Sequence, residues 1–270
     1  MQDGFVASDS VRLAYCVDDF TDPWKPAHTL LMLHAAMGSA KRWYAMVPPL
    51  CRDYRVVRLD LRGHGLSQVP PEAPPLSMDR LVQDVRELLD HLGVTGPVDI
   101  VSNSAGGYVA QNLAMQSPER VRSLVLFGST PGLKESQATT WLPRVARDGL
   151  RKFLADTIED RFPAGHDRGN VEWFLDEAAK NDTPYIGRFV GLMTTLWWMD
   201  DLPRIKCPTL LVVPGAETVG HAGNYDKMLA RLPDAEMISY PGLPHNICDI
   251  VPDRCAADVL AFLRKRFPKD

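Results

Sequence analysis

The sequence contains the stretch Val101-Ser102-Asn103-Ser104-Ala105-Gly106-Gly107, in which a serine stands between two segments of different hydrophobic pattern. A short apolar run typical of a buried strand precedes it, and residues 108–114 after it have helical spacing. A strand that turns directly into a helix holds Ser104 in a strained conformation, and such a turn accepts only small residues two positions away on either side. Ser102 and Gly106 meet this requirement, so the stretch predicts that Ser104 is a nucleophile at the end of a strand.

Two motifs resemble those of the α/β-hydrolase family. The S-x-S-x-G pattern around Ser104 is similar to the family's G-x-S-x-G turn, with Ser102 in place of the first glycine. The string Asp60-Leu61-Arg62-Gly63-His64-Gly65-Leu66-Ser67 is similar to the family's D-x-R-G-H-G-x-S turn, where we expect His64 to be structural. The resemblance covers nearly the whole chain. It implies an α/β fold with a mostly parallel central sheet flanked by helices and a helical cap insertion.

Apolar runs and amphipathic segments alternate along the chain as in a parallel sheet with helical crossovers. Residues 5–17 predict an opening hairpin, and residues 77–92 predict a helix with Ser77 as its N-cap. Further strands are expected at 29–33, 54–60, 98–101, 121–128, 208–214 and 236–240, and further helices at 225–232 and 253–267. Residues 131–203 show only helical patterns, around 139–147, 150–162, 171–180 and 184–198. We therefore expect a core of residues 1–130 and 204–270 with a helical cap at 131–203.

Composition narrows the class of protein. The 270 residues, 45% hydrophobic and 24% charged, suit one large soluble α/β domain, and no apolar stretch is long enough to span a membrane. A net charge of −4 with scattered basic residues argues against nucleic acid as a partner. Five widely spaced cysteines without a C-x-x-C pair indicate a reducing compartment and no structural zinc. Without a recognisable secretion signal, we expect a cytoplasmic protein that acts on a small molecule with no cofactor or metal; a homodimer stays open.

A serine hydroxyl is almost inert at neutral pH, so it needs a histidine as general base and an acid to orient that histidine. In this fold the order along the chain is nucleophile, acid, histidine. His245 follows the last predicted strand in Pro241-Gly242-Leu243-Pro244-His245, close to the family's P-G-x-G-H string. The family's aspartate position after strand 208–214 holds Glu217, which we expect to be the acid, with Asp226 and Asp201 as alternatives.

The backbone amides that stabilise the oxyanion are expected at two places. One is the amide of Ala105, immediately after the nucleophile. The other lies in the loop after strand 29–33, where the family usually has His-Gly and this chain has His34-Ala35-Ala36. We expect the amide of Ala36 to serve there, because a backbone N–H aimed at the substrate oxygen is all that the chemistry needs.

Segments 34–43, 141–149, 159–162 and 199–209 resemble the 3-oxoadipate enol-lactonase branch of the family. This resemblance implies a serine hydrolase that cleaves an ester or lactone of a small organic substrate, of the kind met in the breakdown of aromatic compounds. The chain departs from the branch at Ser102, where glycine is usual, and at Glu217, where aspartate is usual. For substrate binding we expect Trp43 and Trp197, and an inward-facing arginine, Arg161 or Arg188, to pair with a substrate carboxylate.

The sequence is also compatible with other functions. The pair Asn103-Ser104 also resembles the meta-cleavage-product hydrolases, which cut carbon–carbon bonds, but these often have tryptophan where Asn246 follows the histidine. Cofactor-independent dioxygenases use the same fold with a serine and a histidine–acid pair. Receptor-like members of the fold bind ligands without catalysis, which a complete triad disfavours. A carboxylate nucleophile, as dehalogenation requires, is not present at the Ser104 position.

Overall fold

The computed structural model describes residues 2–134 and 136–268 and contains one eight-stranded sheet in the order β1-β2-β4-β3-β5-β6-β7-β8. β1 and β2 form the expected hairpin, and β2 runs antiparallel to β4. All remaining neighbours are parallel. The strands are β1 (Gln2–Val6), β2 (Arg12–Asp18), β3 (Thr29–Leu33), β4 (Arg55–Leu59), β5 (Val98–Asn103), β6 (Val121–Phe127), β7 (Thr209–Pro214) and β8 (Ala235–Tyr240). The predicted α/β-hydrolase architecture is confirmed.

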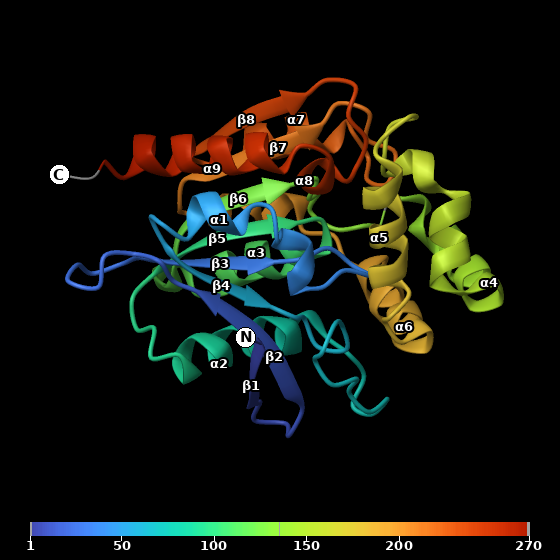
Figure 1. Cartoon of the computed structure of the whole chain (residues 1–270), viewed down its shortest axis with the longest axis horizontal. Coiled ribbons are helices and arrows are strands. Elements are labelled where there is room, and N and C mark those ends of the chain that lie inside the picture. The colour runs from blue at the N-terminus through green and yellow to red at the C-terminus, as the bar shows by residue number, and fades with distance from the viewer. Residues whose placement is uncertain (1, 135, 269–270) are drawn as a thin grey trace.

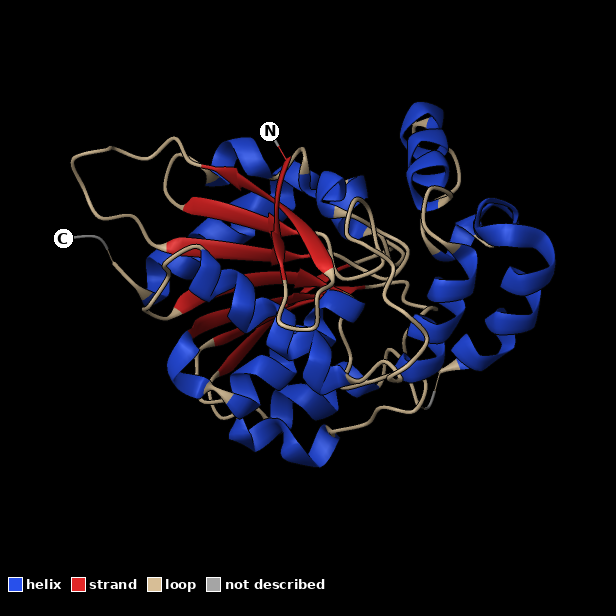
Figure 2. Ribbon diagram, turned by 90° about the horizontal axis from the view of Figure 1, so that it is seen from below, coloured by secondary structure: helices blue, strands red, loops and turns tan. Residues whose placement is uncertain are grey.

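Helices cover both faces of the twisted sheet (Figures 1 and 2). β3, β5 and β7 are buried at every position, and alternate residues enter opposite cores: Leu31 of β3 packs on one face and Met32 on the other. α2 (Met78–His91), α3 (Ala105–Gln116) and α7 (Asn224–Arg231) pack on the Leu31 side. α1 (Val47–Leu50), α8 (Ile247–Ile250) and α9 (Pro252–Arg266) pack on the Met32 side. The sheet is thus buried on both faces.

The N-terminus of α2 illustrates how local chemistry sets an element's bounds. The side chain of Ser77 accepts a hydrogen bond from the amide of Arg80, as an N-cap residue does, and this confirms the prediction. At the other end Gly93 adopts a φ of +67°, a conformation that favours glycine and stops the helix. None of the helices in the described part of the chain is both long and apolar enough to cross a bilayer.

Residues 131–203, hereafter the helical insertion, contain no strand in their described part. The insertion lies beyond the carboxyl ends of the parallel strands (Figure 1). Its longer helices are α4 (Trp141–Asp156), α5 (Arg168–Ala178) and α6 (Thr183–Met193). The connections within the insertion and from it to the core contain short 3-10 helices: η3 (Gln137–Thr140), η4 (Ile158–Asp160) and η5 (Met199–Arg204). The described part of the core contains two more 3-10 helices, η1 (Ala40–Trp43) and η2 (Pro118–Arg120).

The break expected between helices 139–147 and 150–162 is present inside α4. Gly149 takes a φ of +75° and a ψ of 164°, which are not helical, and divides α4 into two helical segments at a kink. Other helix bounds inside the insertion differ from those expected. The chain then leaves the helix at Asp156, and residues 158–160 form η4. α6 ends at Met193, five residues before the expected 198, and Leu196 and Trp197 lie in the connection to η5.

Candidate active site

Ser104 occupies the turn between β5 and α3 with a φ of 49° and a ψ of −117°. A positive φ is strained for any residue that carries a Cβ, so the surrounding structure must impose it. The amide of Ser104 donates to Phe127 O at 2.9 Å, and Ser129 Oγ donates to Ser104 O at 2.9 Å. The end of β6 therefore holds both sides of the serine's backbone.

The glycines after Ser104 allow α3 to begin against the sheet. A Cβ on Gly106 would lie within 3.0 Å of the carbonyl oxygen of Leu33, at the end of β3. A Cβ on Gly107 would lie within 3.0 Å of Ser129 Oγ. Atoms do not approach this closely without displacement of the backbone, so the small residues of the motif are needed for the close approach of the helix to the strands.

The structure brings together His245, in the loop after β8, and Glu217, in the loop after β7. His245 Nδ1 lies 2.8 Å from Glu217 Oε2 and 3.0 Å from Oε1, so a proton on Nδ1 is donated to the carboxylate. This leaves Nε2 as the basic ring nitrogen. The ring also passes close to Gly128 at the end of β6, where a Cβ would lie 3.3 Å from Cε1.

The Glu217 carboxylate is buried and fully hydrogen-bonded. Oε1 accepts the amides of Val219 at 2.8 Å and Gly220 at 3.0 Å, and Oε2 accepts the hydroxyl of Tyr225 at 3.1 Å. Burial alone would raise the pKa of Glu217, but the neighbouring His245 and these amides favour the charged form more strongly and lower the pKa to about 2. Glu217 is therefore ionised at neutral pH.

The alternative acids lie elsewhere. Asp226 is exposed on α7, and Asp201 is exposed on η5, 3.7 Å from Arg204. His64, expected to be structural, is fully buried; its Nδ1 contacts Arg62 O at 3.1 Å, and its ring lies edge-on to Phe189 of α6. Burial lowers the pKa of His64 to about 3, so this histidine is neutral inside the protein.

Ser104 and His245 line the same cavity, which has a volume of about 50 Å³. The amide-bearing residues Ala36 and Ala105 line it too. Neither amide donates a hydrogen bond to any acceptor within residues 2–134 and 136–268, so both N–H groups are available to a substrate oxygen. The helical insertion contributes to the wall with Leu133, Trp141, Leu154, Arg161, Phe174, Val190 and Met193.

Two arginines line this cavity, and they differ in their partners. Arg42, from η1, is paired with buried Asp249: its Nε donates to Oδ1 at 3.1 Å and its Nη2 contacts Oδ2. Arg161, just after η4, is 6% exposed and uses only Nη1, which donates to the carbonyl and hydroxyl oxygens of Thr157 at 2.9 Å. No carboxylate in the described part of the chain pairs with Arg161. Burial accordingly lowers its pKa to about 10.

The structure does not bring the other three expected substrate-binding residues to this cavity. Trp43 is buried in the core on the α9 side of the sheet. Arg188 donates to the carbonyl oxygens of Pro70 and Pro71 at 3.2 Å, so α6 directs it toward the proline-rich loop. Trp197 packs against the core beyond the end of α6. Helical spacing alone does not reveal which face of a cap helix meets the nucleophile.

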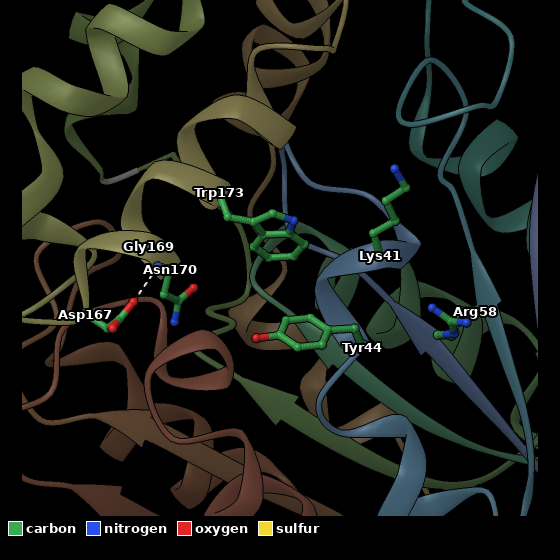
Figure 3. Close-up of a pocket in the computed structure, with 7 residues that line it drawn as sticks. All are labelled: Lys41, Tyr44, Arg58, Asp167, Gly169, Asn170 and Trp173. Atoms are coloured by element: carbon green, nitrogen blue, oxygen red, sulfur yellow. Dashed lines mark hydrogen bonds between the residues drawn. The ribbon is translucent and has the colours of Figure 1, made fainter.

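A separate surface groove of about 560 Å³ lies between η1 and α5. Its aromatic residues are Tyr44 and Trp173, whose ring centroids are 5.2 Å apart at an angle of 70°. Figure 3 shows these two rings side by side, with Lys41 pointing away from them. Lys41 and Trp173 line the groove, whereas their neighbours in sequence, Arg42 and Phe174, line the Ser104 cavity. The Arg42 guanidinium lies 4.9 Å from the Phe174 ring, so this pair separates the two spaces.

Sequence reasoning did not single out Arg42, Asp160 or Tyr225. Arg42 immediately precedes Trp43 in segment 34–43, and its position in the loop after β3 is the signal that could have found it. Asp160 contacts both catalytic loops: its carbonyl accepts the amide of His245 at 3.2 Å, and its Oδ1 accepts the hydroxyl of Thr218 at 2.8 Å. No sequence pattern points to the roles of Asp160 and Tyr225, which depend on tertiary contacts.

A family model described as "alpha/beta hydrolase fold" matches residues 28–168, which include the serine turn. The chain belongs to the α/β-hydrolase family. It is 28% identical to the pimeloyl-[acyl-carrier protein] methyl ester esterase of Nitrosomonas europaea over 80% of this chain and 88% of that protein. It is 30% identical to a non-heme chloroperoxidase of Streptomyces lividans over 91% of this chain and 95% of that protein.

Solved structures agree with this assignment. The enol-lactonase from Burkholderia xenovorans LB400 superposes with a TM-score of 0.88 over 97% of this chain and 99% of that one, at 19% sequence identity. At this identity the likeness establishes the fold that the two α/β hydrolases share. Together, the family and its esterase relative support hydrolytic activity for this chain.

Proposed function

We propose that this α/β hydrolase is a serine hydrolase that cleaves an ester or lactone of a small organic substrate through Ser104, His245 and Glu217. The observation that carries the proposal is the 2.8 Å contact between His245 and the Glu217 carboxylate, on the wall of the cavity that also contains Ser104. Further support is that Ser104 and His245 line one cavity and that the three residues stand in the order along the chain that this chemistry requires. The enol-lactonase branch is the proposed place of this chain within the family.

In the proposed reaction, His245 Nε2 takes the proton of Ser104 Oγ as this oxygen attacks the substrate carbonyl carbon. The carbonyl oxygen becomes an oxyanion that accepts hydrogen bonds from the amides of Ala36 and Ala105. The intermediate then expels the alcohol oxygen, which receives the proton from His245, and an acyl group remains on Ser104. Water, deprotonated by the same histidine, attacks the acyl carbon and releases the acid. Glu217 stabilises the imidazolium in both halves.

The helical insertion is proposed to act as the cap of this site. The lining supports this role, because the insertion supplies most of the apolar side chains around Ser104. In a cavity lined mostly by apolar side chains, the amide donors and the imidazolium act with little screening by water. The cytoplasmic location and the homodimer stay predictions from the sequence.

The test is covalent labelling followed by kinetics. A fluorophosphonate is expected to add once, at Ser104, and Ser104→Ala is expected to lower turnover by at least about a thousandfold on p-nitrophenyl esters or lactones. Ser136→Ala, in the insertion, is the matched control and should retain activity. Labelling at another residue, or an active Ser104→Ala enzyme, would sink the proposal. Ring-cleavage dienones, assayed alongside, test carbon–carbon cleavage, and oxygen consumption tests a dioxygenase.

A further inference from the structure

We infer that Arg42 is a positioning residue, because its ion pair with Asp249 joins the two loops that carry an oxyanion donor and the general base. The pair holds the amide of Ala36 at a fixed separation from His245. The inference rests on the proposed function and adds a residue to that site. It starts from a pair whose side chains are only 9% and 2% exposed. The pair joins the segment after β3 to the segment after β8, and both segments line the Ser104 cavity.

The aspartate of this pair belongs to the histidine loop. Asp249 lies in α8, four residues after His245, and its amide donates to Asn246 O at 2.9 Å. Its own carbonyl oxygen accepts Asn170 Nδ2 of α5 at 2.9 Å. The carboxylate accepts Arg42 Nε at Oδ1, at 3.1 Å, and Arg42 Nη2 contacts Oδ2. The backbone and the side chain of Asp249 are thus both fixed relative to the general base.

The arginine of the pair lies against the loop that carries Ala36. This loop is a tight turn, in which the amide of Gly38 donates to Ala35 O at 3.1 Å. The amide of Arg42 donates to Ser39 O, also at 3.1 Å. A Cβ on Gly38 would lie 3.3 Å from Arg42 Cδ, so the aliphatic stem of the arginine packs against the turn. The stem therefore contacts the oxyanion loop while the guanidinium bonds to the histidine loop.

The two proposed oxyanion donors are held in different ways. Ala105 is the first residue of α3 and directly follows Ser104, whose backbone is held by the end of β6. Ala36 lies in a turn outside the helices and strands, and Arg42 links this turn to the histidine loop. One edge of the guanidinium is occupied by the Asp249 carboxylate. Arg42 therefore acts on the substrate through the position of Ala36.

The effect on catalysis depends on when the oxyanion exists. The substrate carbonyl oxygen gains its negative charge only on the way to the tetrahedral intermediate. A displaced Ala36 amide should therefore lower kcat and leave KM nearly unchanged. Arg42→Met removes the guanidinium and leaves the Asp249 carboxylate buried without its counter-charge. Arg42→Lys keeps the charge without the planar fork, so it should recover only part of the loss in kcat.

The kinetic test compares a p-nitrophenyl ester with the thionoester of the same acyl group, in which sulfur replaces the carbonyl oxygen. Sulfur is a weaker hydrogen-bond acceptor than oxygen, so the thionoester gains less from the two amides. Arg42→Met should lower kcat for the ester about 10- to 100-fold and change its KM by less than about threefold. The ratio of ester kcat to thionoester kcat should fall at least about fivefold. Equal losses on both substrates would show a general structural effect and overturn the inference.

Two further variants separate position from stability. Arg122→Met breaks a matched buried pair, in which Arg122 binds the Asp99 carboxylate through Nε and Nη2 near the start of β5. It should lower the resistance to urea but leave kcat within about threefold of wild type. Arg42→Met combined with Asp249→Leu also removes the unpaired charge, so it should regain resistance to urea without regaining kcat. A double variant with near wild-type kcat would refute the positioning role.

A crystal structure separates this inference from the proposed function. In the Arg42→Met protein the amide of Ala36 should be displaced relative to the His245 ring, whereas the amide of Ala105 should keep its place. An unchanged loop refutes the positioning role whatever the enzyme hydrolyses. Conversely, a displaced loop in a protein whose Ser104 is neither labelled nor needed for turnover would refute the serine mechanism alone.

Discussion

His245 Nδ1 lies 2.8 Å from Oε2 and 3.0 Å from Oε1 of Glu217, and the carboxylate is held there by groups other than the histidine. The amides of Val219 and Gly220 bind Oε1, so the glutamate side chain folds back onto its own loop. The acid is thus oriented before a proton reaches the histidine.

Replacing the carboxylate by an amide should disable the triad without unfolding the protein. Glu217→Gln is expected to lower turnover about a hundred to ten thousandfold, because an amide does not stabilise the imidazolium and its NH₂ group can hold the wrong tautomer. Stopped-flow or steady-state kinetics with a p-nitrophenyl ester measure the effect. Asp226→Asn, an exposed acid nearby in sequence, is the control and should leave turnover unchanged. A Gln variant with near wild-type turnover would place the acid elsewhere.

Shortening the acid should restore only part of the activity. Glu217→Asp keeps the charge, but an aspartate that bonds to the Val219 and Gly220 amides no longer reaches Nδ1 at the same distance. We expect turnover about 10- to 100-fold below wild type, yet above that of Glu217→Gln. The ranking of the three enzymes in one assay checks this. Full activity in the aspartate variant would show that the loop adjusts freely.

Much of the fold was predictable because its strands are short apolar runs and its main helices carry clear end signals. β3 reads as a buried strand in sequence and is buried at every position in the structure. The serine turn was predictable for the same reason, since only small residues fit around Ser104. The break at Gly149 was predictable too, since the expected helices 139–147 and 150–162 end and begin on either side of it.

The lining of the cavity could not be predicted to the same degree. Arg161 and Arg188 both lie in segments with a helical sequence pattern. In the structure Arg188 is bonded to the Pro70 and Pro71 carbonyls, whereas Arg161 lines the cavity of Ser104, and the sequence pattern does not distinguish these two positions. What separates them is how the insertion sits on the core. The partners of Asp160, at Thr218 and His245, are 58 and 85 residues away along the chain. Such contacts leave no local signal in a single sequence.

The glycine two residues after the nucleophile should contribute to the stability of the fold. Gly106→Ala places a Cβ within 3.0 Å of Leu33 O, so either α3 or β3 must shift, and we expect lower stability by about 1–3 kcal/mol. Gly187→Ala, inside α6 with no atom within 4 Å of the added Cβ, is the control. It should be neutral or stabilising by up to about 1 kcal/mol, from helix propensity. Urea denaturation measures both, and equal stability of the two variants would contradict the packing argument.

Two buried histidines should make stability sensitive to mild acid. Burial lowers the pKa of His34 from 6.5 to about 4, and burial together with His34 lowers that of His64 from 6.5 to about 3. Above pH 6.5 both histidines are neutral in the folded and unfolded chains, so their protonation does not lower the free energy of unfolding. As pH falls from about 6.5 toward 4, the unfolded chain takes up protons that the folded chain does not. Stability should fall by up to about 1.4 kcal/mol per pH unit for each histidine.

Urea unfolding at several pH values between 7.5 and about 4.5 checks this slope. Glu217, whose pKa is lowered from 4.5 to about 2, loses its contribution only below that window, so the histidines are measured separately from it. His64→Gln should lower the slope of the free energy of unfolding against pH by the amount that corresponds to about one proton. This holds whatever the substitution does to the free energy of unfolding at pH 7.5. His221→Gln, at an exposed position, should not. A stability that is flat between pH 6.5 and 4.5 would mean that neither buried histidine stays neutral.

Asp160 should couple the two catalytic loops. Its side chain accepts the hydroxyl of Thr218, next to Glu217, and its carbonyl accepts the amide of His245. Only the side-chain contact can be removed by mutation, so Thr218→Val and Asp160→Ala should each lower kcat/KM about 2- to 10-fold, the worth of one hydrogen bond. Because they break the same bond, the double variant should lose no more than either single one. If the losses in kcat/KM multiply in the double variant, Asp160 and Thr218 act independently. In that case the loop that carries Glu217 would be positioned without the helical insertion.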